Sequence, residues 1–175
     1  MAIERSKRPV GATRIAGLAH RLLDGSTLCA IATVSASGRA YVNTAYFAWR
    51  RDLQLIWLSE PRARHSQNLR VNATTAVAVY DSSQTWGEPD SGIQLFGSAR
   101  ELAGQAAIDA ASIYEERFPT YRSADLTAYG FYAFRPHRIK LFDERSLGAG
   151  VFVTARVARA GPLAWEKTEI YRASS

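Results

Sequence analysis

The chain has 175 residues, of which 47% are hydrophobic and 22% charged, so it is long enough and apolar enough for an ordinary globular domain. These values exclude collagen, a coiled coil and an intrinsically disordered chain. The formal net charge is +6. Half of this charge lies in residues 1–14, where four cations accompany one acid, namely Arg5, Lys7, Arg8 and Arg14 against Glu4. Because the remaining body is only mildly basic, we do not expect it to bind nucleic acid.

The sequence also predicts the cellular compartment of the protein. No run approaches the roughly 18 apolar residues of a membrane span, and the N-terminus lacks the apolar segment of a signal peptide. The single cysteine, Cys29, lies in the apolar run LCAIATV and cannot form an intrachain disulfide. We expect it to be a small buried side chain in a soluble, cytoplasmic protein that binds no membrane.

The first half of the chain predicts a helix followed by three strands. Apolar residues recur at helical spacing over 13–24, and Gly25 follows as a stop. From Thr27 the pattern becomes that of strands, with LCAIATVSA, RAYVNTAYFAW and LQLIWLS separated by the turn Ser37-Gly38 and a charged turn at 50–52. This order predicts an antiparallel meander.

The second half predicts two more helices and five strands. A helix is expected through PRARHSQNLRVN (61–72), with Ser59 as its cap. The strands TAVAVYD and IQLFGSAREL follow, joined by a long polar loop, SSQTWGEPDSG. A helix carrying Tyr114 and Phe118 is expected to end at Pro119, before the strands YGFYAF, RIKLF and VFVTARV.

Many strands joined by tight turns predict a mainly β, α+β fold, a closed antiparallel barrel flanked by helices. The expected division is a basic tail at 1–12, the barrel domain at 13–158 and a C-terminal tail at 159–175, where the periodic pattern is weak.

Several kinds of catalytic chemistry lack a motif. The three histidines, His20, His65 and His137, do not have the spacing of a zinc site, and no Gly-x-Ser-x-Gly nucleophile is present, so no metal is expected. Gly148-Ala149-Gly150 is interpreted as a turn. The acid pairs Glu115-Glu116 and Asp143-Glu144 are interpreted as solvated surface. No side chain stands out as a catalytic acid or base, and none is named.

One segment suggests phosphate binding. Ser59, Arg62, Arg64 and His65 place a hydroxyl, two guanidinium groups and an imidazole at the expected start of a helix. Free backbone N–H groups at a helix N-terminus attract anions, and an arginine adds a bidentate donor. The alternative is an ordinary basic surface helix. Asn68 follows Arg64 by four residues and either extends this polar site or bonds locally.

A second segment suggests a surface for a flat ring. Asn43 and Thr44 interrupt the apolar and aromatic run AYVNTAYFAW, and polar groups in a barrel wall need partners. A planar heteroaromatic ring along this strand would bond to its backbone and contact Tyr46 or Trp57. The alternative is aromatic core packing.

Taken together, these segments resemble the pyridoxamine 5′-phosphate oxidase-like family of FMN-binding split barrels. The resemblance covers roughly residues 12–158. It rests on the order and spacing of CAIATVSASGRAYVNTAYF, WLSEPRARHSQNLRVN, AVAVYDSS with IQLFGSAREL, and FRPHRIKLFDE.

The resemblance implies an FMN site at a homodimer interface, with the backbone of the second predicted strand at the isoalloxazine ring. Asn43, Thr44, Ala45 and Tyr46 match the ring-facing segment. Leu58 and Ser59 match the strand end near the ribityl phosphate, and Arg64 with His65 matches the basic pair there. Gln94 and the loop around Gln84 and Trp86 are expected to approach a cofactor held by the partner subunit.

The resemblance has limits. Phe47-Ala48 stands where oxidases of pyridoxine phosphate carry a lysine, and FDERSLGAGVFVTARV replaces their basic C-terminal segment, so authentic vitamin B6 oxidase activity is not expected. The sequence therefore predicts an FMN-dependent oxidoreductase acting on an unidentified small organic substrate. Alternatives are a barrel that binds a deazaflavin coenzyme or haem, the latter requiring a histidine as axial ligand, and a non-catalytic module that binds flavin or nucleic acid.

Overall fold

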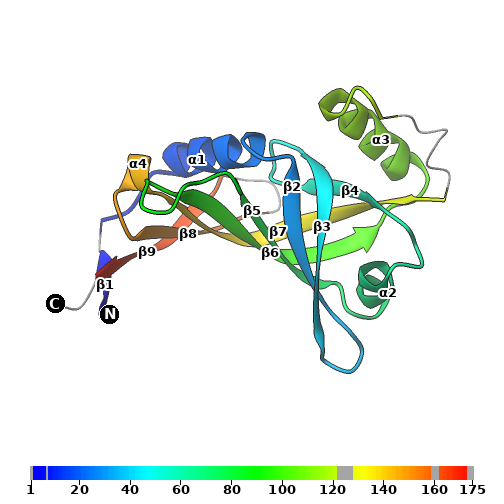
Figure 1. Ribbon diagram of the computed structural model, residues 1–175, viewed down its shortest axis with the longest axis horizontal. Helices are drawn as coiled ribbons and strands as arrows, with labels where there is room; N and C mark the ends of the chain where they lie inside the picture. The colour runs from blue at the N-terminus through cyan, green and yellow to red at the C-terminus, as the bar shows by residue number, and fades with distance from the viewer. Residues whose placement is uncertain (1, 7, 122–127, 159–161, 173–175) are drawn as a thin grey trace. The chain divides into compact units, whose positions relative to one another are not determined.

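The computed structural model describes residues 2–6, 8–121, 128–158 and 162–172 (Figure 1). Its elements in chain order are β1 (Ala2–Ser6), α1 (Ala12–Asp24), β2 (Leu28–Val34), β3 (Ala40–Trp49), β4 (Leu55–Ser59), α2 (Arg64–Val71), β5 (Thr74–Tyr80), β6 (Ser91–Glu101), α3 (Gln105–Arg117), β7 (Gly130–Asp143), α4 (Glu144–Leu147), β8 (Val151–Arg156) and β9 (Ala164–Arg172).

The chain divides into two compact units. Unit 1 comprises Met1–Ser26, Ala78–Leu95 and His137–Ser175, and unit 2 comprises Thr27–Val77 and Phe96–Pro136. The strands β5, β6 and β7 contribute residues to both units.

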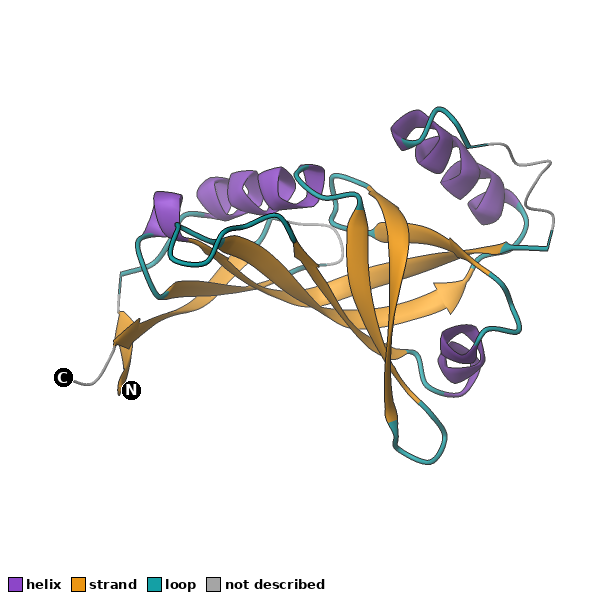
Figure 2. Ribbon diagram, viewed as in Figure 1, coloured by secondary structure: helices purple, strands orange, loops and turns teal. Residues whose placement is uncertain are grey.

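Six strands form the predicted closed antiparallel barrel. They pair in the order β7-β4-β3-β2-β5-β6, and β6 pairs back with β7 to close the ring (Figure 2). The predicted meander of three strands is confirmed, because β2 pairs antiparallel with β3 and β3 with β4. Gly97 allows β6 to approach β7 closely, since a Cβ atom at this position would lie 2.1 Å from the carbonyl oxygen of Arg135.

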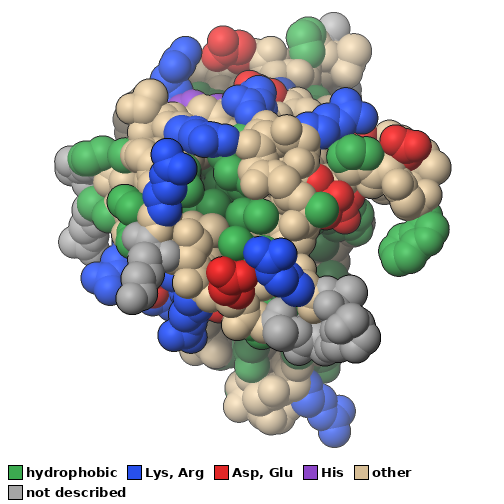
Figure 3. Space-filling view, turned by 90° about the vertical axis from the view of Figure 1, so that its left-hand side faces the viewer, with side chains coloured by type: hydrophobic (Ala, Val, Ile, Leu, Met, Phe, Trp, Pro, Cys, Tyr) green, Lys and Arg blue, Asp and Glu red, His purple; other side chains and the backbone are tan. Residues whose placement is uncertain are grey.

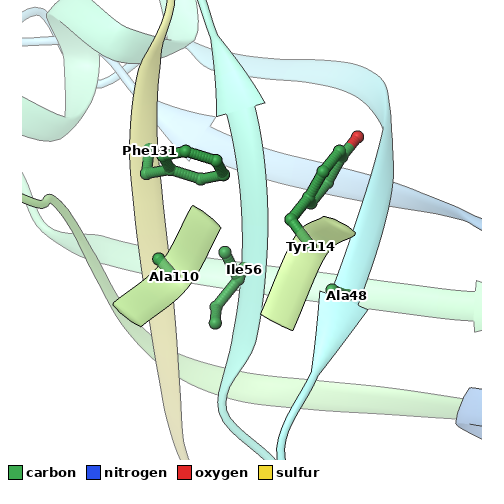
Figure 4. Close-up of a cluster of buried hydrophobic side chains, with 5 residues drawn as sticks. All are labelled: Ala48, Ile56, Ala110, Tyr114 and Phe131. Atoms are coloured by element: carbon green, nitrogen blue, oxygen red, sulfur yellow. The ribbon is translucent and has the colours of Figure 1, made fainter. Parts of the chain in front are cut away.

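Large aromatic side chains fill the core of unit 2. Phe47, Trp57, Tyr132 and Phe134 are completely buried, and the Trp57 and Tyr132 rings stack with their centroids 5.9 Å apart. The helix α3 packs on β3 and β4 through a second cluster (Figure 4), whose buried members are Ala48, Ile56, Ala110, Tyr114 and Phe131. Burial of these side chains holds β4 and the second half of β3 against α3.

In unit 1, α1 lies along one side of the strands β8 and β9 (Figure 2). The apolar residues that predicted this helix are confirmed as its buried face, with Ile15, Leu18 and Leu23 at most 1% exposed. The strands pair in the order β1-β9-β8-β7, all antiparallel. Ile139 and Val153 are completely buried on one face of this sheet.

Both segments that the sequence led us to regard as tails contain a strand. β1 pairs with β9 over its whole length, and Arg172 forms an ion pair with Glu4 at 3.0 Å. The prediction missed these strands because AIERS and AWEKTEIYR alternate charged with apolar residues only weakly, and each gains its hydrogen bonds from a partner distant in sequence. Residues 1, 7, 159–161 and 173–175 of the two segments lie outside the described residues.

Other local predictions are confirmed with adjusted bounds. The structure merges YGFYAF and RIKLF into the single strand β7, which continues through Pro136. The helix expected at 61–72 begins only at Arg64. The helix α3 ends before Pro119 as predicted, and Gly148 and Gly150 adopt positive φ angles in the predicted turn.

The two acid pairs differ. Glu115 and Glu116 are exposed, as predicted. The interpretation of Asp143 and Glu144 as solvated surface is wrong, because both side chains organise the short helix α4 and the turn after it. Asp143 accepts a hydrogen bond from the Ser146 backbone N–H at 2.9 Å, and Glu144 accepts one from the Gly150 backbone N–H at 3.1 Å.

Candidate functional site

The first seven residues of β3 form an open segment in the wall of unit 2. None of the residues from Ala40 to Tyr46 is buried, whereas Phe47 and Ala48 are completely buried. The open segment pairs with β2 along one edge, but pairing with β4 covers only Phe47–Trp49. Its other edge therefore presents backbone N–H and C=O groups that no strand of the described chain pairs.

The side chains of the open segment divide between two faces. Successive residues of a strand point to opposite sides, so Asn43 and Ala45 share one face while Thr44 and Tyr46 share the other. The Asn43 Oδ1 atom is buried and has no hydrogen-bond partner among the described residues. A buried acceptor without a donor costs free energy, which favours a ligand that donates a hydrogen bond there.

Cys29 lies beneath the open segment. Its Sγ donates a weak hydrogen bond to the Ala45 carbonyl oxygen at 3.6 Å. Burial raises the pKa of the thiol to about 12. The prediction of a small buried side chain is confirmed, because a thiol with this pKa remains protonated and unreactive at neutral pH.

The helix α2 is anchored beside this segment by two side-chain hydrogen bonds. Asn68 is buried and donates to the Thr33 hydroxyl on β2 at 3.0 Å, so it joins the helix to the barrel and does not extend the polar site. The Ser59 hydroxyl, at the end of β4, hydrogen-bonds to His65 Nε2. The expectation that Ser59 caps this helix is wrong, because the helix begins too late and its N-cap residue is Ala63.

The N-terminus of α2 faces the open segment with positive charge. The helix has no side-chain cap, so its first backbone N–H groups lack the partner that a capping side chain would supply. The Arg64 guanidinium lies over the Tyr41 ring on β3, 5.8 Å from its centroid. Tyr41 was not singled out in the sequence, although its alternation with Asn43 and Ala45 could have placed it on this face.

His65 is half-buried, and burial lowers the pKa of its imidazole from the usual 6.5. The ring is therefore neutral at pH 7. A neutral imidazole still donates one hydrogen bond, and it becomes cationic where an anion offsets the cost of burying the charge. Arg64, His65 and Ser59 consequently provide one permanent charge and two polar groups at one end of the open segment.

Two aromatic residues proposed to contact a ring have different roles. Trp57 is completely buried and stacks on Tyr132, so the expectation that it lines a surface pocket is wrong. Tyr46 is 57% exposed and touches Phe118 edge-on, with their centroids 5.8 Å apart. Leu58 is half-buried on β4, next to Ser59.

Gln94 and the loop around Gln84 and Trp86, which were predicted to approach a partner's cofactor, belong to unit 1. Gln94 is exposed on β6. The loop between β5 and β6 is confirmed and fully exposed, with Trp86 at 100%. Gln84 folds back on this loop, where its Nε2 donates to the Asp81 carbonyl oxygen at 2.9 Å. The approach of Gln94 and this loop to a partner's cofactor stays a prediction.

The outer face of the β2–β3 hairpin is mostly apolar and is exposed in the described part of the chain, with Thr44 as a polar residue within it. Leu28 pairs with Tyr46 and Ala32 with Val42, so these residues share one face. Leu28, Val42 and Tyr46 are 45%, 70% and 57% exposed. Exposed large apolar side chains gathered on one face favour an interaction surface.

The family of the chain is shown by a match over most of its length. Residues 18–143 match the family model described as pyridoxamine 5′-phosphate oxidase. The chain therefore belongs to the pyridoxamine 5′-phosphate oxidase family, and its barrel is the split barrel of that family. No curated protein matches the chain.

Solved structures share this fold at low sequence identity. A Clostridium acetobutylicum protein related to general stress protein 26, of the pyridoxinephosphate oxidase family, is similar with a TM-score of 0.63 and 12% identity over 85% of this chain and 97% of that chain. A haem-binding protein from Mycobacterium smegmatis has a TM-score of 0.66 and 15% identity over 86% of this chain and 60% of that chain. HutZ, the haem-storage protein from Vibrio cholerae, has a TM-score of 0.56 and 16% identity over 67% of this chain and 87% of that chain.

Membrane spans and metal clusters are both absent from the described residues. None of the helices in the described ranges is long and apolar enough to cross a membrane. The same ranges hold no group of three or more His, Cys, Asp or Glu side chains placed to bind a metal ion.

Proposed function

We propose that this chain binds FMN along the open segment of β3 and acts as a flavin-dependent oxidoreductase on a small organic substrate. The observation that supports the proposal is one arrangement in unit 2. A strand edge with unpaired backbone groups adjoins an uncapped helix N-terminus that carries Arg64 and His65. The first feature suits the polar edge of a flat ring, and the second suits a phosphate group.

The residues present fit FMN. The orphaned Asn43 Oδ1 accepts a hydrogen bond, and an isoalloxazine ring carries an N–H donor as well as acceptors. Asn43, Thr44, Ala45 and Tyr46 would hold the ring, chiefly through their backbone, because their side chains point to two faces. Leu58, Ser59, Arg64 and His65 would hold the ribityl phosphate end. Gln94 would approach from the partner subunit.

The outer face of the hairpin supports a homodimer. Leu28, Val42 and Tyr46 are exposed there, and a second copy of the chain would present the same face in return. Dimerisation would cover the open segment from the side that α2 leaves free.

The chemistry that FMN supplies when bound is transfer of a hydride at its N5 atom. The chain's own part is to bind and orient. Arg64 supplies a permanent positive charge and His65 a hydrogen bond, and the Ser59 hydroxyl holds the His65 ring in one orientation. Tyr46 and Phe118, whose rings meet edge-on, would border the ring at the other end of the segment.

Haem is the second candidate, because two similar structures are described as haem-binding or haem-storage proteins. Of the three histidines that could ligate haem, His65 on α2 is the one beside the open segment. Its Nε2 already hydrogen-bonds to Ser59, so coordination through that atom would break this contact. The structural features near β3 therefore favour FMN over haem, with a deazaflavin coenzyme as the remaining alternative.

The test is the visible absorption spectrum of the full chain purified without added cofactor and again after incubation with FMN, haem or a deazaflavin coenzyme. We expect a flavin spectrum, release of FMN on heating, and reduction of the bound flavin by a nicotinamide donor. A haem spectrum that disappears in a His65→Ala variant would overturn the FMN assignment. Tight FMN binding without reduction or reoxidation by any substrate would leave a non-catalytic flavin-binding module.

A further inference from the structure

A second cluster of cations lies in unit 1, on the sheet of β7, β8 and β9. Lys140 on β7 pairs with Thr154 on β8, and Thr154 pairs with Lys167 on β9. Residues directly opposite one another on paired strands point to the same face, and adjacent strands are about 4.8 Å apart. The two lysines therefore flank Thr154 on one face of the sheet. This face is opposite the one that carries Ile139 and Val153.

Both lysines converge on a single carboxylate. Lys167 Nζ donates to Glu169 Oε1 at 2.8 Å, and Lys140 Nζ lies 3.6 Å from Glu169 Oε2. The Glu169 side chain is only 10% exposed, and its hydrogen bond with Lys167 lowers its pKa, so it stays ionised. Two positive charges against one negative charge leave an excess of +1 in a partly desolvated place, where an anion is attracted more strongly than at an open surface.

Thr154, which lies between the two lysines on the central strand, has an unsatisfied hydroxyl group. Thr154 is only 4% exposed, and its hydroxyl is buried without a hydrogen-bond partner in the described parts of the chain. A buried hydroxyl in this position is destabilising unless a ligand or a neighbouring group bonds to it. Because Thr154 lies between two lysines in this row, an anionic acceptor is the fitting partner.

The next row of the same face repeats the charge excess. Arg138 pairs directly with Arg156, and both contact Glu166, at 3.0 Å and 3.7 Å. With Arg5 on β1, which lies directly opposite Glu169, the cations on this face outnumber the carboxylates by five to two. Lysine is also rare in this chain, since only Lys7, Lys140 and Lys167 occur among its 22 Lys and Arg residues, yet two of the three meet here.

Aromatic rings hold Lys140 in place. Its ammonium lies over the rings of Phe152 and Tyr171, 4.8 Å and 5.4 Å from their centroids, and donates to the Tyr171 hydroxyl at 3.3 Å. Such contacts favour a fixed cation over a mobile one.

One side of the molecule shows Lys and Arg side chains around a group of hydrophobic ones (Figure 3).

We propose that this face of unit 1 binds the phosphate group of a small molecule, with Lys140, Lys167 and Thr154 as its donors. A phosphate monoester carries close to two negative charges at neutral pH, which suits a face where cations outnumber carboxylates. The site uses none of the residues assigned to FMN, so the two proposals are independent and can be tested separately.

The scarcity of lysine provides the test. In the full chain labelled only at lysine side chains, NMR should show three lysine signals, with Lys7 as an internal reference. Titration with inorganic phosphate should shift the Lys140 and Lys167 signals to saturation, whereas chloride at the same ionic strength should not. Repeating the titration in an Arg64→Ala variant excludes binding at the helix α2. Stronger binding of glycerol phosphate than of inorganic phosphate would identify a monoester as the ligand, and equal binding would identify free phosphate.

Variants separate a binding site from a purely structural network. Lys140→Met or Lys167→Met should weaken phosphate binding about tenfold, and Thr154→Val about fivefold. Glu169→Gln should strengthen it several-fold, because it removes the internal competitor for both lysines. Arg172→Gln removes an arginine paired with Glu4 in the same sheet and should have no effect. Lysine signals that do not move, or move equally with chloride, or a Glu169→Gln variant that loses binding, would overturn the proposal.

Discussion

The first half of β3, which is the open segment, and its second half, Phe47–Trp49, have different surroundings. The open segment pairs with β2, and a hydrogen bond from the Phe47 N–H to the Thr27 carbonyl oxygen follows this pairing. Val42 is 70% exposed, while Phe47 is completely buried. The difference arises because β4 and α3 cover only the second half. The second half is thus part of the folded core, and the first half is a surface whose apolar and polar groups are satisfied only by a ligand or a second chain.

The largest effect that tests this contrast is the loss of a core side chain. Phe47→Ala should lower the free energy of unfolding by about 3–5 kcal/mol, because it leaves a cavity in the core of unit 2. Val42→Ala, five residues earlier, should lower it by less than about 1 kcal/mol in the monomer. Urea denaturation followed by circular dichroism measures both. Similar losses would show that the first half is also part of the core.

Removing the basic groups at α2 should affect ligand binding and leave the fold intact. The double variant Arg64→Ala, His65→Ala should weaken FMN binding about 100-fold, since each charged or polar contact to a phosphate contributes about 1.5–3 kcal/mol. Flavin fluorescence titration gives the dissociation constant. The control is Arg50→Ala, which removes an exposed arginine in the turn before β4. Undiminished flavin affinity in the double variant would rule out this phosphate site.

A charge on the outer face of the hairpin should break the proposed dimer. Val42→Arg should weaken self-association about tenfold or more, because the guanidinium would be buried without a partner. Sedimentation velocity at several protein concentrations measures this. Val71→Arg is a matched control, since Val71 is similarly exposed, at 63%, near the end of α2. An unsubstituted chain that stays monomeric would remove the basis for the dimer.

The smallest expected effect concerns pH. Because burial lowers the pKa of His65 from 6.5, the unfolded chain takes up a proton on this residue before the folded chain does. Stability should therefore fall as the pH drops below 6.5 toward the lower pKa of the folded state, and His65→Gln should reduce this dependence. Urea denaturation of the apo protein between pH 5 and 7.5 tests it. An unchanged pH dependence in the variant would assign the effect to other groups.

Predictions from sequence were reliable where a segment's own pattern decides its structure. The apolar stripe of α1, the alternation in β2 and the turn at Gly148 all appear as expected. They failed where a distant partner decides. The strands β1 and β9 have weak patterns and form because they pair with each other. Trp57 was predicted to contact a ring in a surface pocket because it is a large aromatic residue. It is buried instead, and Tyr132, far along the chain, stacks on it.

The candidate site shows the same division. The residue types at Arg64, His65 and Asn43 indicate phosphate and ring binding by themselves, because the chemistry of each group is local. The spacing of residues in the sequence could not predict the tertiary contacts. These are the hydrogen bond between Ser59 and His65, the position of Arg64 over the Tyr41 ring, and the alignment of Lys140, Thr154 and Lys167 across three strands.

The sequence by itself determined the order of most elements, the family and the chemical character of the basic helix end. Only the tertiary structure decided which half of β3 remains uncovered and which cations share a carboxylate. The physical reason is that helical and strand periodicity depends on neighbours within a few residues, whereas burial and charge pairing depend on contacts between strands far apart in the chain.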